Sequence, residues 1–121
     1  MTPPSEGLEI TVTAFQWAWG FTYPNGVQTT NNVVVPVNET VIFHVTSSDV
    51  KHKFGIPYFK IAADAIPGEN NTIWIRSTST GEYSIRCYEL CGIGHAYMTG
   101  RLTVVNQTQF SQWLSNVTRS G

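Results

Sequence analysis

The sequence predicts an all-β domain, a Greek-key sandwich or barrel, followed by one short helix. Two observations predict the sheets: only 12% of the 121 residues are charged, and threonine, serine, valine and asparagine are plentiful between frequent glycines and prolines. β-Branched residues favour strands, and short strands separated by turns are typical of sandwiches and barrels. We therefore expect about seven strands in a single domain that spans residues 1–121.

The first strand is expected at residues 8–19, because apolar and polar side chains alternate from Leu8 to Ala14. A period of two residues indicates a strand with one buried face. Trp17 and Trp19 lie two residues apart, so on a continuous strand they would face the same side. The sequence Tyr-Pro-Asn-Gly at residues 23–26 then predicts a turn.

Five further strands are expected, at residues 33–37, 40–46, 71–77, 81–87 and 100–105. Pro36 has no amide hydrogen, so its strand should lie at a sheet edge or contain a bulge. Trp74 and Trp113 are assigned to the core, because aromatic side chains bury large apolar areas. His44 lies within an apolar strand and is assigned a structural role.

One long stretch, residues 48–70, contains Pro57 and Pro67 and shows no clean period. Long irregular segments in small domains are often functional, so we expect a functional loop here. The tail changes period, because apolar residues recur at helical spacing from Phe110 to Val117. A short helix is therefore expected, with Asn106 or Thr108 as its N-terminal cap.

The charge pattern argues against a nucleic-acid partner, because eight acidic and seven basic residues are spread along the chain without a basic run. No apolar stretch is long enough to span a bilayer, so a soluble fragment without a membrane anchor is expected. Four Asn-x-Thr triplets hint at an extracytoplasmic location. They begin at Asn38, Asn70, Asn106 and Asn116.

The segment CYELCGIGHAYM, residues 87–98, concentrates metal-binding side chains. It contains Cys87 and Cys91, the only cysteines of the chain, together with His95 and Met98. A disulfide across three intervening residues closes a small ring that adds little stability, and it leaves the histidine and methionine unexplained. A zinc site formed with His52 is a second alternative, but methionine is a poor zinc ligand.

Thiolates, imidazoles and a weak axial thioether together favour copper. A single blue copper needs one cysteine, two histidines and a distant methionine, and it would leave one thiolate unused. Two thiolates in one loop can bridge two copper ions, with one histidine for each ion. The second cysteine therefore favours two copper ions over one.

These residues also carry a resemblance to a known family. The segment at 87–98 fits Cys-x-Glu-x-Cys-x-x-x-His-x-x-Met, and it resembles the copper A motif of subunit II of cytochrome c oxidase. DVKHKF at residues 49–54, DAIPG at 64–68 and FQWAWGFTY at 15–23 resemble three further segments of that family. The resemblance runs from about residue 8 to 105, with departures at Lys53 and Glu69.

The resemblance implies a cupredoxin-like fold and a binuclear copper A centre. The ligands that it implies are two bridging thiolates, two imidazoles, a thioether and a backbone carbonyl, from Cys87 and Cys91, His52 and His95, Met98, and Glu89. The carboxylate of Glu89 would also reach a magnesium or manganese site shared with subunit I. Trp17 corresponds to the tryptophan where electrons enter, and Trp19 is second to it.

The function that the resemblance implies is electron transfer. The domain would accept electrons from a soluble donor, a cytochrome c or a small copper protein, and pass them to haem in subunit I of a terminal oxidase. By itself it would be an electron carrier, attached in its native state to the extracytoplasmic face of a membrane by an N-terminal anchor. Three alternatives stay open: the copper A domain of a nitrous oxide reductase, a copper chaperone or storage module, and a structural domain with a Cys87–Cys91 disulfide.

Overall fold

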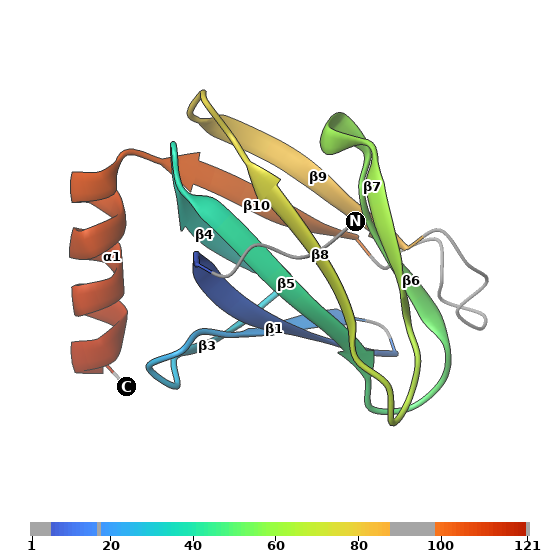
Figure 1. The fold of residues 1–121 in the computed structure, drawn as a ribbon. Coiled ribbons are helices and arrows are strands. Elements are labelled where there is room, and N and C mark those ends of the chain that lie inside the picture. The colour runs from blue at the N-terminus through green and yellow to red at the C-terminus, as the bar shows by residue number, and fades with distance from the viewer. Residues whose placement is uncertain (1–5, 17, 88–98, 121) are drawn as a thin grey trace.

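The computed structural model describes residues 6–16, 18–87 and 99–120, which form two five-stranded sheets and one α-helix (Figure 1). The first sheet contains, in spatial order, β3 (Gln28–Thr30), β2 (Ala18–Thr22), β1 (Leu8–Phe15), β5 (Thr40–Ser47) and β8 (Asn71–Arg76). The second sheet contains, in spatial order, β4 (Asn32–Pro36), β10 (Thr99–Val105), β9 (Gly81–Cys87), β6 (His52–Ile56) and β7 (Ile61–Ala65). The 3₁₀-helix η1 (Pro57–Phe59) joins β6 to β7, and α1 (Gln107–Ser120) follows β10.

The two sheets pack face to face around one apolar core. Alternate residues of neighbouring strands point into it, among them Ile10 and Val12 of β1 and Val41 and Phe43 of β5. β1 pairs with β5, and β4 with β10, in parallel, so strands that are neighbours in space are distant in sequence. The predicted cupredoxin-like sandwich with a C-terminal helix is confirmed, and β4, which contains Pro36, lies at a sheet edge as expected.

The expected first strand is in fact two strands. β1 ends at Phe15, which pairs with Ala18 at the start of the antiparallel strand β2. Trp19 therefore belongs to the returning strand, and Trp17 lies outside the described residues. The prediction of one continuous strand over residues 8–19 is therefore wrong. No glycine or proline lies at the reversal between Phe15 and Ala18, so no turn signal predicts it.

Residues 48–70, expected to be irregular, contain an antiparallel pair of strands. Phe54 of β6 lies opposite Ala63 of β7, and Pro57 opens η1, where a missing amide hydrogen costs no helical bond. Three consecutive residues of β6, from Phe54 to Ile56, are buried. A strand that is buried without alternation has no period of two, which explains why the prediction of a loop was wrong here.

The C-terminal helix is capped by Asn106. Its side-chain oxygen accepts a hydrogen bond from the Gln109 amide at 2.7 Å, and Gln109 Oε1 lies 3.4 Å from the Asn106 amide that donates to it. This reciprocal pair is a capping-box arrangement, so Asn106 is the cap and Thr108 lies within the helix. Among the described residues, no helix is long and apolar enough to cross a bilayer.

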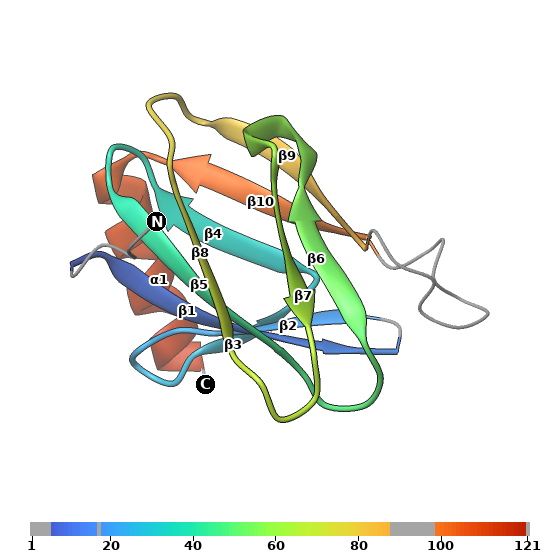
Figure 2. The same cartoon turned by 45° about the vertical axis from the view of Figure 1, so that its right-hand side comes forward.

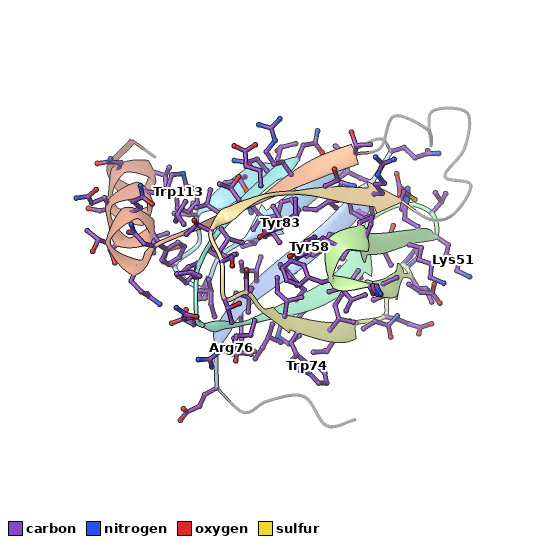
Figure 3. All side chains as sticks on the ribbon, turned by 90° about the horizontal axis from the view of Figure 1, so that it is seen from above. Lys51, Tyr58, Trp74, Arg76, Tyr83 and Trp113 are labelled. Atoms are coloured by element: carbon purple, nitrogen blue, oxygen red, sulfur yellow. The ribbon has the colours of Figure 1, made fainter. Side chains whose placement is uncertain are left out.

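The two tryptophans that were assigned to the core have different positions (Figure 3). Trp113 of α1 packs against the core, with its ring centroid 5.2 Å from that of Tyr23. Trp74 is half-buried on the outer side of β8, because its neighbours Ile73 and Ile75 point inward. The assignment of Trp74 to the core is therefore wrong.

One end of the sandwich, which we call the loop end, lies away from α1 (Figures 1 and 2). β1 and β5 finish there and β6 begins there, since the Gln16 amide after β1 bonds to Asp49 before β6. Cys87 ends β9 and Thr99 begins β10 at the same end, and Thr99 lies opposite Arg86. The two strands that flank residues 88–98 are thus held side by side.

Candidate metal centre

His52 is the first residue of β6 and points inward at the loop end. Its side chain is fully buried, 0% exposed. The ring Nε2 donates a hydrogen bond to Asp49 Oδ1 at 2.9 Å. A carboxylate oxygen can only accept, so the Nε2 atom carries the hydrogen, and a neutral imidazole with this tautomer has its lone pair on Nδ1.

The Nδ1 atom of His52 has no hydrogen-bond partner among the described residues, although it is buried. Nearly all buried polar atoms in proteins have a partner, and an unpaired one is costly. A metal ion accepts the lone pair of a neutral imidazole, and metal-bound histidines commonly donate their other nitrogen to a carboxylate. The side chain of His52 therefore fits a metal ligand bound through Nδ1.

Asp49 holds this arrangement together. Its Oδ2 accepts a hydrogen bond from the Gln16 amide at 2.6 Å, and its Oδ1 accepts one from the Val50 amide, also at 2.6 Å, besides the bond from His52. Burial would raise the pKa of Asp49, but the hydrogen bonds from Gln16, His52 and Val50 outweigh it and lower the pKa to about 2. The carboxylate is therefore ionised at neutral pH and fixes the ring of His52.

Asp49 was not among the residues predicted from the sequence to take part in the site. The residue stands in the quoted segment 49–54, three positions before His52, where a carboxylate can reach the histidine ring. That spacing was the signal that could have identified it, because carboxylates orient metal-bound histidines in many sites.

Cys87 is the last residue of β9 and lies on the strand next to His52. It pairs with Phe54 of β6, two positions beyond His52, and both side chains point to the inner side of the sheet. Such diagonal neighbours have Cα atoms about 7–8 Å apart, a separation that two ligands of one metal centre can span. The sulfur of Cys87 is in a disulfide bond.

The other predicted ligands lie outside the described residues. These are Glu89, Cys91, His95 and Met98. Among the described residues, no three His, Cys, Asp or Glu side chains gather as a metal-binding group. The structure thus brings His52 and Cys87 onto adjacent strands, and the roles of the remaining ligands stay predictions.

Trp19 lies behind His52 in the core. Its ring centroid is 6.3 Å from that of His52, with the planes at 64°, and 5.2 Å from that of Phe54. Trp19 is 0% exposed, so it makes no surface through which a donor could contact it directly. Its predicted place, second to Trp17 in the electron path, stays a prediction.

The surroundings of the loop end are mixed in character. Val50 is 44% exposed, and Lys51 beside it is also exposed, near the point where β9 ends (Figure 3). Lys53 is half-buried on the outer side of β6, opposite Asp64 of β7. The exposed side chain of Val50 thus lies near both basic and acidic residues, and these residues do not form an acidic face.

The sequence matches the family model for the cytochrome c oxidase subunit II periplasmic domain over residues 25–107. The chain belongs to this family. The matched range includes His52, Cys87 and the whole segment 88–98, and it leaves Trp17 and Trp19 outside.

Similar proteins agree with this subunit II membership. Heme-copper oxidase subunit 2 of Aeropyrum pernix is 46% identical over 113 residues, covering 89% of this chain and 48% of the relative. The probable cytochrome c oxidase subunit 2 of Rickettsia bellii is 33% identical over 135 residues, covering 93% of this chain and 50% of the relative. The chain thus spans about half the length of the curated relatives that it matches.

Solved structures agree as well. The crystal structure of the periplasmic domain of subunit II of cytochrome oxidase of Bradyrhizobium japonicum has a TM-score of 0.93 and 33% identity, covering 99% of both chains. A mixed disulfide intermediate between a thioredoxin-like protein and subunit II of cytochrome c oxidase has a TM-score of 0.87 and 33% identity, covering 99% of this chain and 98% of that one. The alternatives of a nitrous oxide reductase domain and of a copper chaperone gain no support from these comparisons.

Proposed function

We propose that this subunit II domain carries electrons through a binuclear copper A centre at the loop end. The observation that carries the proposal is the state of His52: it is fully buried, its Nε2 is tied to Asp49, and its Nδ1 has no partner among the described residues. The position of Cys87 on the adjacent strand and the family match support it.

The proposed ligand set is the one that the sequence motif implies. It comprises His52 through Nδ1, the thiolates of Cys87 and Cys91, the imidazole of His95, the thioether of Met98 and the backbone carbonyl of Glu89. Two copper ions held by these residues would share one electron, so each transfer would change the geometry at either ion only slightly. The protein's contribution is to hold the ligands still, through the paired strands β6 and β9 and through the carboxylate of Asp49.

The proposed partners are those of a terminal oxidase. Electrons would come from a soluble donor, a cytochrome c or a small copper protein, reach the centre by way of Trp17 and Trp19, and leave to haem in subunit I. The carboxylate of Glu89 would contribute to a magnesium or manganese site at the contact with subunit I. The contact between Trp19 and His52 supports this path. The location would be the extracytoplasmic face of a membrane.

The disulfide of Cys87 has a consequence for metal loading. Copper binds the thiolate, so the S–S bond has to be cleaved first. A dithiol reductant would supply two electrons and two protons, giving two thiols on this chain and a disulfide on the reductant. The mixed disulfide between a thioredoxin-like protein and a similar subunit II domain supports this step.

The test is copper stoichiometry together with electron paramagnetic resonance on the reduced domain after copper loading. The expected result is two copper ions per chain that share one unpaired electron, with hyperfine structure from both nuclei. One copper ion with a single-nucleus pattern would overturn the binuclear assignment. If the chain bound no copper although its thiols were free, residues 87–98 would have a structural role instead.

A further inference from the structure

Asn31 occupies the point where the chain crosses from the first sheet to the second. β3 ends at Thr30 and β4 begins at Asn32, so Asn31 is the single residue between strands of different sheets. Its φ angle is 60°, in the left-handed region that asparagine tolerates better than most residues. In this conformation its backbone amide and its side chain both reach Trp19, whereas its carbonyl reaches Arg101.

Three hydrogen bonds join Asn31 to both sheets close to the loop end. Its amide donates to the Trp19 carbonyl at 2.7 Å, and its Oδ1 accepts from the Trp19 amide at 2.8 Å. Its own carbonyl accepts from the Arg101 amide at 2.9 Å. Asn31 therefore ties β2 of the first sheet to the start of β10 of the second.

Gly100 shows how closely these elements approach. A Cβ atom at Gly100 would lie 3.0 Å from the Asn31 carbonyl oxygen and 3.4 Å from Trp19 Cδ1. Few real Cβ contacts are so short, so the absence of a side chain at Gly100 lets β10 lie directly against Asn31 and Trp19. The spacing between the strands is therefore defined by contact, with little room to vary.

Trp19 extends this connection to the proposed ligand. Its amide and carbonyl are held by Asn31, and its ring packs edge-on against His52 in the core. On its other side, Asn31 holds Arg101, which follows directly after Gly100 near the beginning of β10. Asn31 thus contacts both the support of His52 and the strand that follows residues 88–98.

We propose that Asn31 is a positioning residue for the metal centre. Asn31 holds Trp19, whose ring packs against His52, at a fixed position relative to the start of β10. It therefore limits how far His52 can move away from the start of β10. The results expected for the copper-loaded protein rest on the proposed function. The results expected for the metal-free protein do not depend on it.

The decisive variant is Asn31→Gly, matched by Asn38→Gly. Asn38 is also a left-handed asparagine, with φ of 61°, but it lies in the turn between β4 and β5 at the end away from the loop end. Glycine keeps the left-handed backbone at both positions and removes only the side chain. Asn31→Asp serves as the conservative variant, because it keeps an oxygen that can accept from the Trp19 amide.

In the metal-free chain, we expect the Trp19 amide of Asn31→Gly to exchange with solvent about five- to tenfold faster, the effect of losing one hydrogen bond. The His52 ring resonances should shift in Asn31→Gly and stay unchanged in Asn38→Gly and Asn31→Asp. In the copper-loaded chain, Asn31→Gly should alter the hyperfine splitting and the reduction potential, and Asn38→Gly should alter neither. The unfolding free energies of both glycine variants separate these effects from a general loss of stability.

Unchanged His52 resonances together with a parent-like copper signal in Asn31→Gly would overturn the inference. If the parent bound no copper, the proposed function would fail, and the His52 and Trp19 resonances would still decide the role of Asn31. If Asn31→Gly did not fold, Gly100→Ala would apply the same test from β10, because its added methyl group meets both Asn31 and Trp19. A parent-like ring signal and copper spectrum in Gly100→Ala would then contradict the inference.

Discussion

Two histidines of this chain each bond to a carboxylate, yet one points into the core and the other points outward. His52, on the inner side at the loop end, is 0% exposed and bonds to Asp49 at 2.9 Å. His44, on the outer side of the first sheet, is 26% exposed and lies 2.8 Å from Glu9. The two histidines differ in the hydrogen bonding of the second ring nitrogen. His44 Nδ1 lies 3.3 Å from Thr72 Oγ1, whereas His52 Nδ1 has no partner among the described residues.

A carboxylate–histidine pair does not by itself mark a metal site. On the outer face, the carboxylate of Glu9 and the hydroxyl of Thr72 can satisfy both ring nitrogens of His44, so neither nitrogen needs a further partner. On the inner face, burial makes the free nitrogen of His52 costly unless a ligand meets it. The His44–Glu9 pair is therefore a surface ion pair, whereas the His52–Asp49 pair orients a histidine that has a ring nitrogen left for a ligand.

The largest expected effect separates the two histidines directly. His52→Ala should abolish the two-copper signal, because it removes one of the two predicted imidazole ligands, whereas His44→Ala should leave the signal intact. Copper per chain and the paramagnetic resonance spectrum measure both variants. Loss of the signal in His44→Ala, with that variant folded, would remove the distinction between the two faces.

The next effect concerns the carboxylate. Asp49→Asn keeps the shape of the side chain but removes the charge that fixes the His52 ring, so copper affinity should fall about 10- to 100-fold. A competition titration against a chelator of known affinity measures the change. Asp64→Asn is the matched control, since Asp64 lies opposite Lys53 on the outer side of the second sheet. Equal losses in both variants would indicate a general electrostatic effect and contradict a specific role for Asp49.

A smaller effect is expected in the metal-free chain as the pH is lowered. The pKa of Asp49 is lowered from 3.8 to about 2 on folding. Its contribution to the free energy of unfolding is therefore fully present above pH 3.8 and is lost as the pH falls through about 2. Urea unfolding across this interval should show a steeper loss for the parent than for Asp49→Asn. Parallel curves for the two proteins would mean that the carboxylate gains nothing from its hydrogen bonds in the folded state.

Much of this fold could be predicted from the sequence, because most strands keep one face buried and show it as alternation. The strands at residues 71–77 and 81–87 appeared as β8 and β9 within one residue at each end. The alternation also indicated the true position of Trp74, since Ile73 and Ile75 beside it carry the inward face. Trp74 was assigned to the core because it is aromatic, but the register of the strand places its side chain on the outer face.

The parts that could not be predicted depend on contacts between distant segments. β6 shows no alternation because three consecutive residues from Phe54 are buried, and only its neighbours in the second sheet reveal it as a strand. The candidate ligands His52 and Cys87 were found from type and spacing. The bond from the Gln16 amide to Asp49 joins residues 33 positions apart, and nothing local in the sequence encodes it.

The smallest expected effect tests the outer pair by itself. In a double-mutant cycle with His44→Ala and Glu9→Ala, the coupling free energy should be about 0.2–1 kcal/mol, as for other exposed ion pairs, and it should shrink with added salt. The reason is that Glu9 is 62% exposed, so water competes with the histidine for its carboxylate. Urea unfolding of the parent, both single variants and the double variant at low and high salt gives the coupling. A salt-insensitive coupling above about 2 kcal/mol would mean that the outer pair is as strongly desolvated as a buried one. Burial would then no longer explain why His52, and not His44, has a ring nitrogen available to a metal.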